Sequence, residues 1–144
     1  MIRWGGALLV GALVLGGCGS VSPATAMTTW AAQSNYRANA KTLIATVVRS
    51  ASALGNPSST SADLHTVCAV LYLEADQLNA PLPTPDARAT ALVSGALIDI
   101  GRGASECYDA SASESARRRS IAFFSKGLGV LSEATARIAS IAAP

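Results

Sequence analysis

Apolar residues recur at steps of three and four along four long segments of this chain, and clusters of Pro and Gly separate these segments. Such spacing places the apolar side chains on one face of an α-helix. The chain shows no convincing period-two alternation, the pattern typical of a half-buried strand. We therefore expect an all-α domain in which each helix buries one apolar stripe.

The predicted helices cover residues 28–54, 62–79, 86–108 and 113–141. In chain order, the residues expected in their buried stripes are Tyr36, Ala40, Leu43, Val47, Ala51 and Leu54; Leu64, Val67, Leu71, Ala75 and Leu78; Ala89, Leu92, Val93, Ala96, Ile100, Ala104 and Cys107; and Ile121, Phe124, Leu128, Leu131, Thr135, Ile138 and Ile141. Short connections between long amphipathic helices favour antiparallel neighbours, so the sequence predicts an up-down four-helix bundle.

The expected core is made mainly of small side chains. Half of the residues are hydrophobic but only 5% are aromatic, so burial stabilises this core less than a core rich in Leu and Phe. Five glycines also fall within the last two predicted helices, at Gly95, Gly101, Gly103, Gly127 and Gly129. Each costs up to about 1 kcal/mol relative to Ala. They either let two helices cross closely or bend a helix and open a groove.

The first seventeen residues have the features of an export signal. Arg3 precedes an uncharged apolar run over residues 4–15, and the small residues Gly16 and Gly17 follow it. The run is shorter than the roughly 20 residues needed to span a bilayer. Leu15, Gly16, Gly17 and Cys18 together resemble the lipobox of bacterial lipoproteins.

The lipobox resemblance implies cleavage between Gly17 and Cys18 and a diacylglycerol on the Cys18 sulfur. Two acyl chains give stable anchoring, whereas one gives only reversible binding. The protein would then sit on the extracytoplasmic face of the cell membrane. The alternatives are an uncleaved membrane helix and an ordinary cleaved signal in which Cys18 has no role.

The chain as a whole is similar to the small, Ala-rich, helical lipoproteins of actinobacteria and of the phages that infect them. Many of these proteins have no assigned activity. Phage-encoded lipoproteins of this size are associated with blocking further infection by covering or altering surface receptors. The resemblance therefore implies a non-enzymatic role in the cell envelope, such as superinfection exclusion or an accessory function.

Residues 18–27 are expected to form the lipidated start and a flexible tether, because Ser20, Ser22, Pro23 and Thr25 interrupt regular structure. Residues 28–144 then form one helical domain, which is an ordinary domain size. Without Arg3, ten Lys or Arg balance nine Asp or Glu. This near neutrality does not favour nucleic acid as a partner.

Cys68 and Cys107 are the two cysteines that the anchor does not use. Thiols outside the cytoplasm are oxidised, and an up-down bundle brings these two positions to nearly the same height. We therefore predict a disulfide, with two free buried thiols as the alternative. A zinc site is not expected, because two cysteines and the distant His65 do not supply a ligand set.

The rest of the chain shows no catalytic motif. It contains no nucleophile elbow, phosphate-binding glycine loop or metalloprotease helix, and a lone His65 is most simply a surface or capping residue. We expect no cofactor other than the covalent lipid and no metal. Two charge sets, Asp99/Arg102/Glu106 and Glu133/Arg137, have the spacing of exposed pairs along a helix.

The only run of like charge is Arg117, Arg118 and Arg119, which we interpret as a solvated helix start or as a site for an acidic protein partner. Our first hypothesis for the whole chain is an anchored interaction module for an envelope protein. The alternative is a carrier or sensor of a small apolar ligand, with a cavity among the small residues of the third and fourth predicted helices. A filled core with an exposed patch favours the first, and a sizeable apolar cavity favours the second.

Overall fold

The computed structural model describes residues 21–110 and 113–143 of the chain. The described residues form α1 (Pro23–Gln33), α2 (Tyr36–Gly55), α3 (Ser61–Asn79), α4 (Ala87–Asp109) and α5 (Glu114–Ala142), with no strand among them. The prediction of an all-α domain is confirmed. The predicted signal peptide, its cleavage site and Cys18 lie outside the described residues, so they stay predictions.

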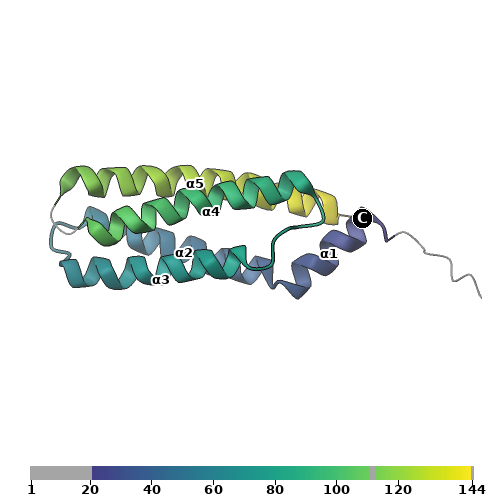
Figure 1. Ribbon diagram of the computed structural model, residues 1–144, viewed down its shortest axis with the longest axis horizontal. Coiled ribbons are helices and arrows are strands. Elements are labelled where there is room, and N and C mark those ends of the chain that lie inside the picture. Colours follow the sequence, from purple (N-terminus) through teal and green to yellow (C-terminus); the bar gives the residue numbers. More distant parts are fainter. Residues whose placement is uncertain (1–20, 111–112, 144) are drawn as a thin grey trace, which may run out of the picture.

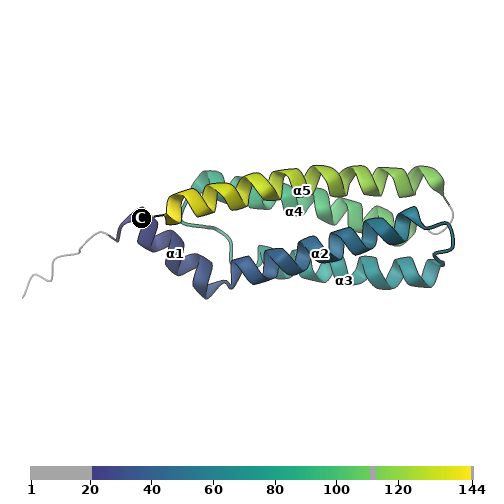
Figure 2. The same ribbon diagram turned by 180° about the vertical axis from the view of Figure 1, so that it is seen from behind.

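The four long helices lie side by side, and each runs opposite to the helix before it (Figures 1 and 2). The most extensive packing is between α4 and α5, followed by α3 against α4 and α2 against α3. Both α1 and α2 also contact α5, which closes the arrangement around a shared core. The short α1 lies at one end of the molecule, close to the C-terminal end of α5 (Figure 2).

The prediction of a single first helix over 28–54 is wrong, because the chain breaks at Ser34 and Asn35. Asn35 has φ 50° and ψ 33°, a left-handed conformation that Asn tolerates better than most residues. The Ser34 hydroxyl donates a hydrogen bond to the Trp30 carbonyl oxygen at 2.7 Å, which satisfies an acceptor at the end of α1. The break lets α1 turn across the end of the bundle.

The predicted flexible tether is also wrong over residues 23–27, which are helical. Ser22 caps this helix by accepting a hydrogen bond from the Thr25 amide at 3.1 Å, and Pro23 occupies the first turn, where its missing N–H costs nothing. Met27 is fully buried in the core. The ordered domain therefore begins several residues earlier than the composition indicated.

The other three helices begin and end within one residue of the predicted positions. Asp86 and Ser113 cap α4 and α5 by accepting hydrogen bonds from the third helical amide. At α3 the cap is Thr60. Asp63 completes a capping box with it, accepting from the Thr60 amide at 2.9 Å.

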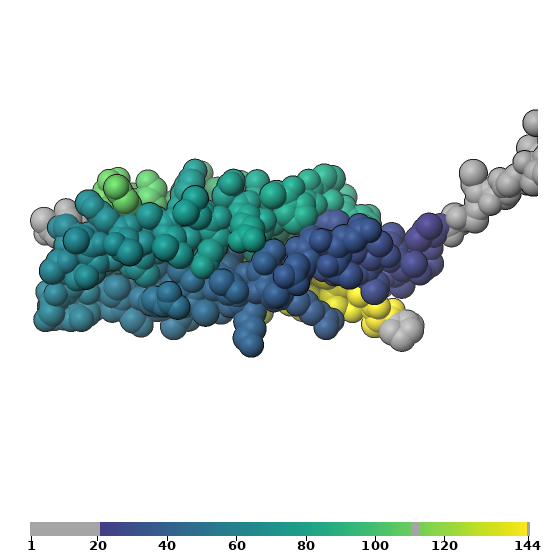
Figure 3. All heavy atoms as spheres, turned by 90° about the horizontal axis from the view of Figure 1, so that it is seen from below, coloured from purple at the N-terminus to yellow at the C-terminus, as the bar shows by residue number. Residues whose placement is uncertain are grey.

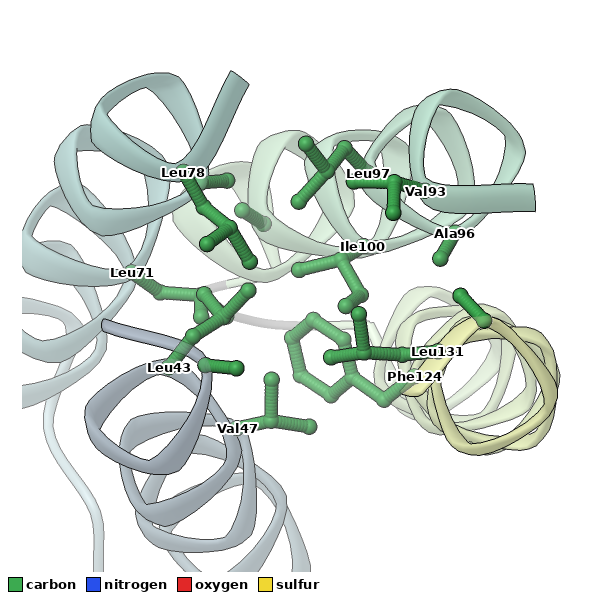
Figure 4. Packing of buried hydrophobic residues seen from close by; sticks show 14 of the residues in the cluster. Leu43, Val47, Leu71, Leu78, Val93, Ala96, Leu97, Ile100, Phe124 and Leu131 are labelled. Atoms are coloured by element: carbon green, nitrogen blue, oxygen red, sulfur yellow. The ribbon is translucent and has the colours of Figure 1, made fainter. Parts of the chain in front are cut away.

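The core is filled by one stripe from each long helix (Figure 4). Large side chains that are almost fully buried come from all four, and they include Leu43 and Val47 of α2, Leu71 and Leu78 of α3, Val93 and Ile100 of α4, and Phe124 and Leu131 of α5. Most of the predicted stripe residues are buried. Six of them lie partly buried at the edge of the core, namely Ala51, Val67, Leu92, Ile121, Leu128 and Ile141, and Thr135 is exposed.

Two of the five glycines lie where α4 and α5 approach most closely. A Cβ atom on Gly103 would lie 2.6 Å from the Phe124 ring, and one on Gly127 would lie 2.6 Å from Ile100 Cγ1 and 3.0 Å from the Ala96 carbonyl oxygen. In contrast, a Cβ atom on Gly101 or Gly129 would meet nothing within 4 Å. Close crossing therefore accounts for Gly103 and Gly127 but not for Gly101 and Gly129, and a Cβ atom on Gly95 would only touch Val130 Cγ1 at 4.0 Å.

Candidate functional site

The surface over α3 and α4 exposes large apolar side chains. Tyr72 and Leu73 of α3 are 59% and 68% exposed, and Ile98 and Tyr108 of α4 are 56% and 45% exposed. Each lies beside the buried stripe of its helix rather than within it, so burial in this chain does not explain the residue type. We call these four residues the α3–α4 face.

Two adjacent hollows, of about 420 Å³ and 410 Å³, lie along this face and meet at Tyr72. Small residues such as Ala69, Gly101 and Ser105 line them, which leaves room between the larger side chains. The absence of a side chain on Gly101 thus keeps this surface open. The α3–α4 face combines projecting rings with depressions, a shape suited to receiving side chains from another molecule.

One end of the face is held by two contacts between α3 and α4. The structure brings Cys68 and Cys107 together at disulfide distance, with Cα atoms 6.0 Å apart, as the sequence analysis predicts. One turn away, the His65 ring stacks on the Tyr108 ring with centroids 4.3 Å apart and an interplanar angle of 13°. His65 therefore supports the position of Tyr108 and does not cap α3, whose cap is Thr60.

Each of the two hollows along the α3–α4 face is lined by one acidic side chain. Asp76 lines one hollow and Asp109 lines the other, while neither hollow is lined by Lys or Arg. Within the described part of the chain, neither carboxylate takes part in an ion pair. The helix α3 contains three acidic residues and no Lys or Arg. A partner for this face should therefore offer apolar side chains together with basic ones.

The arginine run at the start of α5 has partners within the protein. Arg117 donates to the carbonyl oxygens of Leu54 and Asn56, both at 3.1 Å, and so satisfies acceptors at the end of α2. Arg118 pairs with Glu114 at 3.4 Å, and Arg119 pairs with Glu106 at 2.9 Å. Binding of an acidic partner by this run stays a prediction, but Arg117 is engaged in joining α5 to the α2–α3 connection.

The remaining ion pairs link α4 to α5, which corrects the expectation of pairs along each helix. Glu133 pairs with Arg88 at 3.3 Å rather than with Arg137. Asp99, expected on the solvated surface, is buried and pairs with Lys126 at 3.0 Å. Charges at helical spacing thus serve the contact between two helices here.

The shortest of these pairs joins Asp86 and Arg137. The Arg137 guanidinium donates two hydrogen bonds to the Asp86 carboxylate, at 2.6 Å and 2.8 Å. Asp86 also accepts from the Ala89 amide at 2.7 Å as the cap of α4. The Arg137 hydrogen bonds first, and then the amide of Ala89, lower the pKa of Asp86 from 3.8 to about 2. This carboxylate therefore has a structural role.

No group of three or more His, Cys, Asp or Glu within residues 21–110 and 113–143 could hold a metal ion. Over the same ranges, no helix is both long enough and apolar enough to cross a bilayer.

Comparisons of the chain with protein-family models, with curated proteins and with solved structures give no match. On the exposed side chains and hollows described above, the α3–α4 face is the candidate site, and it was not predicted from the sequence. The sequence signal that could have revealed this face is the presence of large apolar residues at helix positions outside the predicted buried stripes.

Proposed function

We propose that this protein is a lipid-anchored envelope lipoprotein that acts as a non-enzymatic interaction module and binds a protein partner through the α3–α4 face. One observation supports this proposal most strongly. One side of the domain exposes four large apolar side chains together, although other apolar side chains already fill the core. These four are Tyr72, Leu73, Ile98 and Tyr108. Exposed Tyr and large aliphatic residues beside hollows are typical of the anchors that dominate binding energy.

The chemistry of the face defines the partner. Apolar side chains of the partner would enter the hollows around Tyr72, and basic side chains would pair with Asp76 and Asp109. We favour a partner segment that carries Lys or Arg on both sides of an apolar stretch. The pairs would lie at the rim, where they affect association rate and specificity more than affinity.

The proposed architecture gives this face a rigid support. In our interpretation α2 to α5 form an up-down four-helix bundle, and α1 covers the end where the described chain begins. Only Gly19 and Ser20 lie between Cys18 and residue 21, and the three steps along the chain reach about 10 Å at most. With a lipid on Cys18, that end of the bundle would lie against the membrane and leave the sides of the bundle accessible.

The anchor is tested by mass spectrometry of the protein from the membrane fraction. We expect a mature chain that begins at Cys18 with a mass increase corresponding to lipid, and we expect a Cys18→Ala variant to leave the membrane fraction. A mature chain that starts elsewhere without lipid would refute the anchor. The partner face would still be testable on the released protein.

The partner face is tested by site-specific photocrosslinking in intact cells. A photoreactive phenylalanine analogue at Tyr72 should yield one dominant crosslinked protein, and the same analogue at the exposed Ser125 of α5 is the matched control. Adding Leu73→Asp and Ile98→Asp to the Tyr72 probe should abolish the crosslink, because both changes place charge in the apolar contact. Equal crosslinks at Tyr72 and Ser125 would count against this face.

Superinfection exclusion is the specific role that the resemblance to phage lipoproteins implies. Cells producing the wild-type protein should then adsorb fewer infecting phage than cells producing the Leu73→Asp/Ile98→Asp variant.

The alternative function, a carrier of a small apolar ligand, is favoured by a separate observation: an apolar groove between α1, α2 and α5.

A further inference from the structure

A groove of about 430 Å³ lies between α1, α2 and α5, and none of the ten residues that line it belongs to the α3–α4 face. Its apolar lining comes mainly from Ala40 and Ile44 of α2 and from Ile138, Ala139 and Ala142 of α5. In Figure 3 this is the side where the C-terminal end of α5, in yellow, emerges beside α1 and α2. The groove therefore lies near the end of the molecule where the described chain begins.

The hydroxyl groups of the groove are already engaged with each other. The Thr135 hydroxyl donates to the Leu131 carbonyl oxygen at 2.9 Å, so its own oxygen is available to accept from the Tyr36 hydroxyl at 3.3 Å. Burial raises the pKa of Tyr36, which keeps this phenol protonated and able to donate. With both hydroxyls satisfied, the interior of the groove favours an apolar occupant.

The charge along the groove has a single sign. Arg37 and Lys41 line it and are exposed, and none of the ten lining residues is Asp or Glu. Within the described residues neither cation takes part in an ion pair. Helices α1 and α2 contain no acidic residue at all. Lys41 also lines a second hollow that Glu74 shares, but it forms no ion pair with Glu74. An apolar trough flanked by two such cations is complementary to a molecule with an alkyl chain and an anionic head.

We propose that this groove binds the acyl chain of an anionic single-chain amphiphile, with the carboxylate or phosphate of its head paired with Arg37 and Lys41. Burial of the alkyl chain against Ala40, Ile44 and Ile138 provides the affinity. The charge-assisted hydrogen bonds select the anion. This inference gives the carrier function a site, and it depends neither on the α3–α4 face nor on the lipid anchor.

The test uses the full chain reconstituted into phosphatidylcholine vesicles that contain a trace of photoreactive amphiphile. Three probes share one diazirine-bearing alkyl chain and differ in the head: a fatty acid at alkaline pH, a lysophosphatidic acid and the uncharged fatty alcohol. After irradiation, peptide mapping locates the adducts. We expect adducts on residues 135–142 and near the α1–α2 turn, with at least about fivefold more from an anionic probe than from the alcohol. The two anionic probes distinguish a carboxylate from a phosphate ligand.

Two variants of α2 provide a matched comparison. Arg37→Gln/Lys41→Gln should reduce labelling by the anionic probes about fivefold and leave labelling by the alcohol unchanged. Arg49→Gln removes another exposed cation of α2 that does not line the groove, so it should leave labelling by every probe unchanged. Filling the groove with Ala139→Trp should abolish these adducts for all three probes.

Equal labelling by the anionic probes and the alcohol would overturn the proposal, as would equal loss in Arg49→Gln. Adducts confined to other parts of the chain would also overturn it. The Cys18→Ala chain, reconstituted in the same vesicles, should give the same adducts as wild type. A failure of the proposed anchor would therefore not be mistaken for a failure of this site.

Discussion

Asp86 carries out two structural tasks with one carboxylate. It caps the start of α4 and binds Arg137 of α5, so it fixes the end of α4 against the last turns of α5. Its pKa of about 2 lies below the 3.8 of the unfolded chain. The folded state therefore holds the carboxylate ionised where the unfolded chain already takes up a proton, and this contribution to stability is present above about pH 4 and lost as the pH falls through 2.

Replacing Asp86 with Asn should separate these two tasks. Asn also caps helices well, so the start of α4 should remain intact, but the bidentate pair with Arg137 is lost. We expect a lower thermal midpoint than wild type at neutral pH, and the difference should shrink as the pH falls from about 4 toward 2. Thermal unfolding followed by circular dichroism across this range measures the effect.

The control for this prediction is Glu133→Gln, which removes the exposed pair with Arg88. Exposed pairs contribute little, so its midpoint should stay close to wild type at every pH. A stability difference between Asp86→Asn and wild type that is the same at pH 2 and at neutral pH would contradict the assignment of the low pKa to this pair.

At the scale of elements, the close approach of α4 and α5 depends on glycines that are not equivalent. In Gly127→Ala the new methyl group would meet Ile100 Cγ1 at 2.6 Å and the backbone of α4 at 3.0 Å and 3.1 Å. Since backbone cannot yield as a side chain does, the helices must separate. We expect a net destabilisation of about 1–2 kcal/mol, after the helix-propensity gain from Ala is subtracted from the overpacking cost.

Gly129→Ala is the matched change two residues further along the same helix. Its Cβ atom would meet no atom within 4 Å, so only the propensity gain remains and we expect stabilisation by about 0.5–1 kcal/mol. Urea unfolding of the two variants gives both values. Changes of the same sign would contradict the packing described for this pair of helices.

The sequence predicted most of the helices because their signals are local. The stripes at three- and four-residue spacing and the Pro and Gly residues that follow α2 and α3 depend only on neighbours in the chain. The break at Asn35 was missed because no Pro or Gly marks it, unlike the breaks that follow α2 and α3, and only the fold shows that α1 must turn there. The tether was misjudged for a related reason: Ser22 and Pro23 break a helix when they lie inside it but start one when they lie at its beginning.

The site was harder to predict because it depends on which helices become neighbours. Asp99 and Lys126 are far apart in sequence, and only the α4–α5 packing brings them together. The same holds for Tyr72 and Tyr108, whose common surface exists only once α3 lies beside α4. Cys68 and Cys107 were the exception, because the export expected from the first seventeen residues and the expected antiparallel order left one simple pairing.

For the molecule as a whole, the contact between Cys68 and Cys107 links the two helices that carry the α3–α4 face. The two cysteines are 39 residues apart in sequence, and the core around them consists largely of small side chains. In the loop-entropy model, a bridge of this length stabilises the folded state by about 4 kcal/mol. That is a large fraction of the 5–15 kcal/mol typical of a folded domain, ~10 kcal/mol on average. We therefore expect global stability, and not only local order, to depend on its oxidation.

The double variant Cys68→Ala/Cys107→Ala should lose about 4 kcal/mol of unfolding free energy in urea. Reduced wild-type protein keeps both sulfur atoms but lacks the bridge. If it loses a similar unfolding free energy, the loss comes from the missing bridge and not from the missing sulfur packing. Adding reductant to the double variant should change nothing. Because His65 and Tyr108 stack one turn from the bridge, the Tyr72 photocrosslink should also weaken in the double variant under conditions where it is still folded. Alkylation of both cysteines in the native protein without reductant would contradict the bridge, and the stability of this small-residue core would then rest on packing alone.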